Sequence, residues 1–166
     1  MEARSSRRIE GSEDVLKGLK ECIDDLEGAF GDELLGLMLF GSWARGEAKE
    51  GSDVDVFVVL RSLKGMKARS AVYRAVARRV GRAVTLIDVR ADELFKEELE
   101  LTPLLLNVLV DGVVIYDKTG ELGELASKAR RLVKAAGLVR YRTPDGKYGW
   151  KRRDERPLEL IRWPSG

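Results

Sequence analysis

The sequence comprises 166 residues with a net charge of +2, and 44% of them are hydrophobic and 35% charged. This length and composition fit one globular domain and exclude a multidomain enzyme, while the lack of any apolar run near the roughly 20 residues of a bilayer span excludes a membrane-spanning protein. Histidine is absent and Cys22 is the single cysteine, which also excludes His-based catalysis, His-ligated zinc and an intrachain disulfide.

Residues 1–12 contain three arginines and no apolar segment follows them, so we expect a flexible N-terminus without an export signal. Together with the single cysteine, this indicates a cytoplasmic protein. Gln is absent and Asn occurs once, beside abundant Lys, Arg and Glu. That bias is typical of heat-adapted proteins, so we expect a thermophilic source.

Hydrophobic periodicity divides residues 13–136 into alternating helices and strands. Apolar residues at three- and four-residue steps predict helices at 13–30 with Ser12 as N-cap, at 68–80, from Thr102-Pro103 onward and at 121–136, with a short helical segment at 92–99. Apolar or β-branched runs predict strands at Leu34–Phe40, Val54–Leu60, Ala83–Val89 and Val113–Tyr116. We therefore expect an α/β fold in which helices flank a central sheet.

Residues 137–166 have a different composition, with eight Lys or Arg against four Asp or Glu. Pro144-Asp145-Gly146 lies between strand-like flanks and predicts a hairpin. We expect a folded domain at 13–136 and a basic aromatic extension at 137–166 that packs on it. The alternative is that the extension binds RNA, because basic side chains attract phosphate and aromatic rings stack on bases.

Two carboxylates, Asp53 and Asp55, lie at the head of an apolar strand, two residues apart. The period of a strand points both side chains to the same side. There they repel each other and lose hydration, which is unfavourable unless a cation neutralises them. Mg²⁺ suits this position, since it binds through one or two carboxylates and substrate phosphates.

Gly41-Ser42 stands where a predicted buried strand meets a turn or helix start. Glycine lets another group approach the backbone closely, and backbone N–H groups at a helix start favour an anion. We therefore expect a phosphate site at Gly41-Ser42 opposite the predicted metal site. Trp43, the next residue, is expected to anchor its loop in the core.

Gly41-Ser42, ten intervening residues and then Asp53-x-Asp55 on a β-branched strand closely resemble the signature of the DNA polymerase beta-type nucleotidyltransferase superfamily. Arg45-Gly46 and Ser52 complete the same pattern. Within that superfamily the chain is similar to the antitoxin-like minimal nucleotidyltransferases, over residues 13 to about 118. The resemblance implies a polymerase beta palm-like fold with a mixed central sheet at 13–136.

The resemblance also implies site residues and a cofactor. Asp53 and Asp55 are expected to bind Mg²⁺, with Mn²⁺ as a substitute, and a third acid from a neighbouring strand is expected to complete the metal site. Asp88 is the best match for that third acid, and Asp92 replaces it if the register shifts. Gly41, Ser42 and Arg45 are expected to bind the nucleotide phosphates.

The implied activity is transfer of a nucleoside monophosphate, AMP from ATP, to a hydroxyl acceptor. Related minimal nucleotidyltransferases imply that the acceptor is a tyrosine of a partner HEPN-domain toxin, which would make this chain an antitoxin. Two alternatives stay open: a non-catalytic module of the same fold that docks on a partner, and an RNA-binding or RNA-tailing protein that uses its basic C-terminal extension. The predicted helix at 121–136 could also contact a second copy of the chain.

Overall fold

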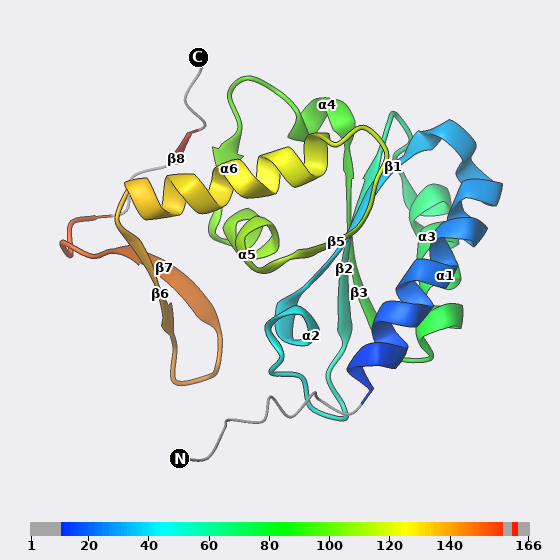
Figure 1. The fold of residues 1–166 in the computed structure, drawn as a ribbon, viewed down its shortest axis with the longest axis horizontal. Helices are drawn as coiled ribbons and strands as arrows, with labels where there is room; N and C mark the ends of the chain where they lie inside the picture. The colour runs from blue at the N-terminus through cyan, green and yellow to red at the C-terminus, as the bar shows by residue number, and fades with distance from the viewer. Residues whose placement is uncertain (1–10, 158–160, 163–166) are drawn as a thin grey trace.

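The computed structural model describes residues 11–157 and 161–162, and a four-stranded sheet lies at its centre (Figure 1). The strands, in their order across the sheet, are β3 (Val84–Arg90), β2 (Val54–Leu60), β1 (Leu34–Phe40) and β5 (Val113–Asp117). Strand β1 is antiparallel to both of its neighbours, whereas β2 and β3 are parallel. The mixed sheet with helices around it confirms the predicted fold class.

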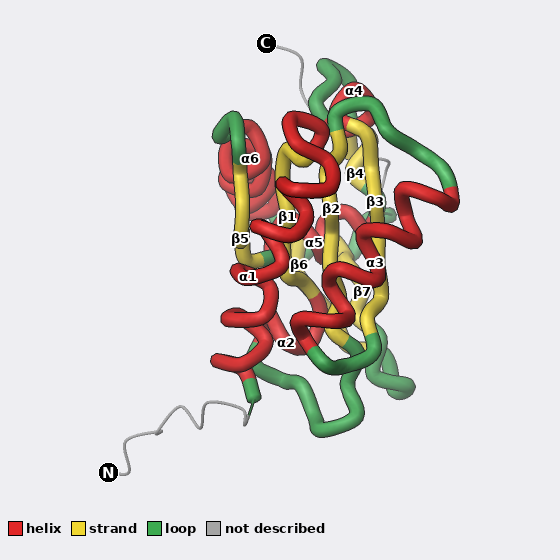
Figure 2. The backbone as a smooth tube through the Cα atoms, turned by 90° about the vertical axis from the view of Figure 1, so that its right-hand side faces the viewer, coloured by secondary structure: helices red, strands yellow, loops and turns green. Residues whose placement is uncertain are grey.

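Helices α1 (Ser12–Phe30) and α3 (Met66–Val80) cover one face of the sheet (Figure 2). They bury alternate residues of β2, such as Val56 and Val58, against their own apolar stripes. Gly11 occupies the cap position of α1, so the prediction of Ser12 as N-cap is wrong by one residue. Among the described residues, no helix combines the length and the apolarity that crossing a bilayer requires.

The opposite face is covered by α5 (Pro103–Asp111) and α6 (Glu121–Ala135). Phe57 and Val59, which alternate with the β2 residues named above, pack on this side. Thr102 caps α5 by accepting a hydrogen bond from the Leu105 amide at 3.2 Å, as predicted. Strand β2 is thus buried on both faces, which explains why its sequence is almost continuously apolar.

The predicted helix at 92–99 is wrong beyond its first turn. The structure has α4 (Ala91–Leu94), then irregular chain, then β4 (Glu100–Leu101). Leu94 and Leu99 are both buried, and residues five apart do not share a face of a continuous helix. The chain leaves the helix after α4, so that both leucines reach the core.

The C-terminal extension forms the predicted hairpin, made of β6 (Leu138–Arg142) and β7 (Tyr148–Arg152). Figure 1 shows the hairpin beside α5, away from the central sheet. Trp150 is buried against this helix, and its Nε1 donates a hydrogen bond to Asn107 Oδ1 at 2.9 Å. Strand β8 (Ile161–Arg162) pairs with β4. At the other end of the chain, the predicted flexible segment at 1–12 lies outside the described residues except for its last two.

Candidate active site

The two halves of the motif meet because β1 and β2 are antiparallel. Phe40, the last residue of β1, pairs with Asp55 near the start of β2. Gly41 and Ser42 follow at once as the first residues of the short helix α2 (Gly41–Arg45). A separation of ten residues in sequence therefore becomes direct contact between the glycine turn and the acidic end of β2.

Gly41 packs against the carboxylate of Asp55. Its φ of +71° is in the left-handed region, and a Cβ added to it would stand 1.9 Å from Asp55 Oδ2. Both the backbone conformation and the contact therefore require a glycine at this position. The structure brings the predicted phosphate site and the first two predicted acids together.

Asp55 is half-buried and Asp53 is exposed. Burial is the main cause that raises the pKa of Asp55, and the nearby charge of Asp53 raises it further, against the lowering effects of Thr85 and Arg45. The Thr85 hydroxyl also donates to Asp53 Oδ2 at 3.4 Å. Within the described ranges neither aspartate forms an ion pair, so their combined negative charge fits a divalent cation.

Asp88 does not join these two acids, which corrects the expectation of a third carboxylate there. In the parallel register Asp88 pairs with Val58, whose side chain faces α1 and α3, whereas Asp55 lies on the face of Phe57. Asp88 also lies three residues beyond Thr85, the partner of Asp55, which is about 10 Å along β3. Thr85, not an acid, pairs with Asp55.

Asp88 instead forms an ion pair with Arg69 of α3. Arg69 also donates from Nη2 to the Leu86 carbonyl at 2.7 Å, which ties the helix to β3. The fallback, Asp92, lies in α4 beyond the far end of β3 and pairs with Arg90 at 3.4 Å. In the part of the chain that the structure describes, no three acidic or thiol side chains form a metal-binding cluster.

The loop between α2 and β2 is closed by its own polar groups. Ser52 accepts a hydrogen bond from the Lys49 amide through Oγ at 2.8 Å, and the Ser52 carbonyl accepts one from Trp43 Nε1 at 3.1 Å. Trp43 is buried in the core beneath α1 and α3, as expected for an anchor of this loop. The bond from Trp43 therefore ties α2 to Ser52, the residue directly before Asp53.

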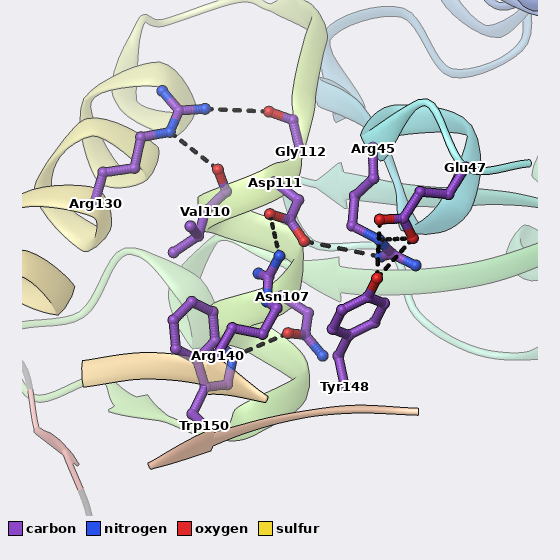
Figure 3. A network of polar contacts seen from close by, with 10 residues as sticks. All are labelled: Arg45, Glu47, Asn107, Val110, Asp111, Gly112, Arg130, Arg140, Tyr148 and Trp150. Carbon is purple, nitrogen blue, oxygen red and sulfur yellow. Dashed lines mark hydrogen bonds and ion pairs between the residues drawn. The ribbon is translucent and has the colours of Figure 1, made fainter. Parts of the chain in front are cut away.

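Arg45 lies in a polar network between α2 and the hairpin (Figure 3). Its Nε is 3.3 Å from Glu47 Oε2, its Nη1 is 3.8 Å from Asp111 Oδ2, and its guanidinium lies 4.4 Å from the ring centre of Tyr148. The Tyr148 hydroxyl donates to Glu47, and this bond is the main cause that lowers the pKa of that carboxyl. Sequence reasoning missed Glu47, Asp111 and Tyr148, because the contacts join segments up to 101 residues apart.

The inward position of Tyr148 and Trp150 also bears on the RNA alternative. These two rings contact α5 and the loop after α2, so they are not available to stack on bases. Tyr141, on the other face of the hairpin, is exposed. The arrangement favours a packing role for the hairpin over RNA binding.

Comparison with known proteins points to one family. The family model described as "Polymerase beta, Nucleotidyltransferase" matches residues 29–121. A Methanocaldococcus jannaschii protein named as a protein adenylyltransferase, MJ1305, is 30% identical over 115 residues, which cover 60% of this chain and 70% of that protein. A second protein of that organism with the same kind of name, MJ0141, is 31% identical over 65 residues, or 39% of this chain and 66% of that one.

Among solved structures, the chain is similar to one titled as a toxin–antitoxin with AMP-PNP. The identity is 20%, the TM-score is 0.49, and the match covers 70% of this chain and 87% of the other. A nucleotidyltransferase structure from Sulfolobus solfataricus is 24% identical, with a TM-score of 0.45, over 70% of this chain and 91% of that one.

Proposed function

The chain belongs to the polymerase beta nucleotidyltransferase family and is a transferase, and we propose that it moves AMP from ATP to a hydroxyl of an acceptor protein. The observation that carries the proposal is the contact between Gly41 and the carboxylate of Asp55. It joins the two halves of the family motif at the start of β2, where Asp53 adds a second negative charge.

Asp53 and Asp55 would hold the divalent cation, Mg²⁺ or Mn²⁺, through their carboxylate oxygens. A cation bound there neutralises triphosphate charge and stabilises the attacking and leaving oxygens of the displacement. The residues present fit such an ion, because Asp55 is partly buried without an ion-pair partner in the described part of the chain. Asp88 has no part in the proposed site.

The remaining motif residues would bind and orient the nucleotide. Backbone N–H groups of Gly41 and Ser42 donate to phosphate oxygens, and Arg45 contributes a positive charge beside them. The acceptor oxygen then forms a bond to the α-phosphorus as the bond from that phosphorus to pyrophosphate breaks. The hydroxyl proton leaves to the exposed carboxylate of Asp53.

A protein is the proposed acceptor because both Methanocaldococcus jannaschii relatives are named as protein adenylyltransferases. The motif resemblance points more narrowly to a tyrosine of a HEPN-domain toxin, with this chain as its antitoxin. The cytoplasm is the proposed compartment, since ATP and such a partner are found there.

The test is incubation with α-labelled ATP, Mg²⁺ and candidate acceptor proteins, a HEPN-domain protein first among them. Wild type should transfer the label, Asp55→Asn should not, and Asp92→Asn should behave as wild type because Asp92 lies beyond the other end of β3. Equal transfer by Asp55→Asn would overturn the proposed site. If wild type transfers no label and titration calorimetry detects no binding of ATP with Mg²⁺, the proposed activity is wrong and the docking-module alternative is favoured.

A further inference from the structure

We propose that the β6–β7 hairpin is a working part of the nucleotide site, in which Tyr148 is a positioning residue for Arg45. This inference rests on the proposed function, because only there does Arg45 contact phosphate. The family model ends at residue 121, and the hairpin begins at Leu138. The hairpin therefore lies outside the matched family domain.

Arg45, Glu47 and Tyr148 form a closed set of three contacts. The Tyr148 ring lies 4.4 Å from the Arg45 guanidinium, and its hydroxyl donates to Glu47 Oε1 and Oε2 at 2.9 and 2.7 Å. Glu47 in turn pairs with Arg45 Nε at 3.3 Å. Each member contacts the other two, so Tyr148 restricts both the plane and the direction of the guanidinium (Figure 3).

The hairpin is held on α5 by contacts that do not involve Arg45. Trp150 is bonded to Asn107 of α5 at 2.9 Å, and Arg140 Nη1 is 2.7 Å from Asp111 Oδ1 at the end of the same helix. The other carboxylate oxygen of Asp111, Oδ2, lies 3.8 Å from Arg45 Nη1. The hairpin and α5 together therefore form one surface that Arg45 contacts through Tyr148 and Asp111.

The charges near the Tyr148 ring leave Arg45 able to bind an anion such as phosphate. The guanidinium groups of Arg140 and Arg142 lie 5.3 and 5.5 Å from the centre of the Tyr148 ring, which Arg45 also contacts. Around this ring, three arginines interact with two carboxylates, those of Glu47 and Asp111, so this set of five side chains has a net charge of +1. An arginine whose side chain is already restrained loses less conformational entropy on binding an anion than a free surface arginine does. The net positive charge of the set also attracts an anion.

The chemistry of the two faces of the hairpin supplies a matched control. Tyr148 lies on the inner face, paired with Arg142, whereas Tyr141 lies on the outer face, paired with Gly149. Tyr141 is 41% exposed and stands near Lys151, at 5.9 Å. Tyr141→Ala therefore removes an aromatic ring from the same hairpin without touching the contacts of Arg45.

The experiment is a double-mutant cycle on the full chain. The dissociation constant of a non-hydrolysable ATP analogue with Mg²⁺ is measured by calorimetry for wild type, Arg45→Ala, Tyr148→Ala and the double variant, with Tyr148→Phe and Tyr141→Ala beside them. We expect Tyr148→Ala to weaken binding about threefold to tenfold. It should have no further effect once Arg45 is alanine, and Tyr141→Ala should bind as wild type.

Tyr148→Phe keeps the ring beneath Arg45 and loses the bond to Glu47, so it should recover most of the affinity that Tyr148→Ala loses. Thermal melts confirm that the variants fold, and turnover of α-labelled ATP should show the loss in KM rather than in kcat. If Arg45→Ala weakens binding while Tyr148→Ala does not, or if the two losses simply add, the positioning role is wrong. If Arg45→Ala itself leaves binding unchanged, the phosphate role in the proposed function fails instead.

Discussion

Gly41 and Asp55 are in direct contact across the β1–β2 pair, so closely that a Cβ on residue 41 would stand 1.9 Å from Asp55 Oδ2. A phosphate bound at the Gly41 backbone and a cation bound at Asp55 would therefore lie side by side. This arrangement follows from one feature of the register, the pairing of Phe40 with Asp55. The contact is the structural basis of the proposed nucleotide site.

Gly41→Ala should both destabilise the protein and prevent nucleotide binding. Gly46→Ala is the matched control, because Gly46 has a similar φ of +73° but no atom within 4 Å of an added Cβ. The strained backbone alone costs about 1–2 kcal/mol, so Gly46→Ala should show only that loss in urea denaturation. Gly41→Ala should lose more, and calorimetry should detect no binding of ATP with Mg²⁺; equal behaviour of the two variants would contradict the contact.

Asp88→Asn should affect stability and not chemistry. It weakens the ion pair with Arg69, whose side chain is 43% exposed, so solvent screening limits the loss to about 1 kcal/mol of unfolding free energy. Label transfer from α-labelled ATP should continue at the wild-type rate. A folded Asp88→Asn variant without transfer would show that Asp88 does act with the other two acids.

Thr85→Asp would place a third carboxylate beside the first two, since Thr85 pairs with Asp55 and contacts Asp53. Added repulsion should lower the melting temperature in EDTA, by about 2–4 °C for each kcal/mol in a chain of this size. Mg²⁺ or Mn²⁺ should then raise the melting temperature more in this variant than in wild type. A metal response no larger than that of wild type would mean that Thr85 does not face the cation.

The raised pKa of Asp55 predicts the sign of a pH effect in metal-free protein. Burial makes the folded state bind this proton more tightly than the unfolded state, so the stability from protonated Asp55 is present below its ordinary pKa and is lost as pH rises through the folded value. The unfolding free energy of Asp55→Asn minus that of wild type should therefore grow from pH 4 to pH 7. Glu47→Gln is the control of opposite sign, because the pKa of Glu47 is lowered and its stabilising effect is lost as pH falls. The unfolding free energy of Glu47→Gln minus that of wild type should therefore fall as pH rises from pH 4 to pH 7. The same pH trend for the Asp55→Asn and Glu47→Gln differences would contradict burial of Asp55 as the cause.

Much of the fold could be predicted from sequence because its signals are local. The continuous apolar run of β1 and the periodic stripe of α1 specify their own burial. The contact of Gly41 with Asp55 was also within reach, since the motif links two segments joined by a short loop. These features depend on few residues between the partners.

The position of Asp88 was out of reach for a physical reason. Alternation along β3 shows that Asp88 and Ile87 lie on different faces, but it does not show which residue pairs with Asp55. The crossover through α3 sets that register, and it selects Thr85. The contact of Tyr148 with Glu47 was likewise hidden, because it joins segments that no local pattern relates.

The most direct test of the account is calorimetric titration of ATP into the protein with and without Mg²⁺, for wild type and for the double variant Asp53→Asn/Asp55→Asn. Wild type should bind ATP more tightly when Mg²⁺ is present, and the double variant should lose that metal dependence while its melting temperature shows an intact fold. If the folded double variant keeps the full effect of Mg²⁺ on ATP binding, the cation is bound elsewhere and the proposed site is wrong.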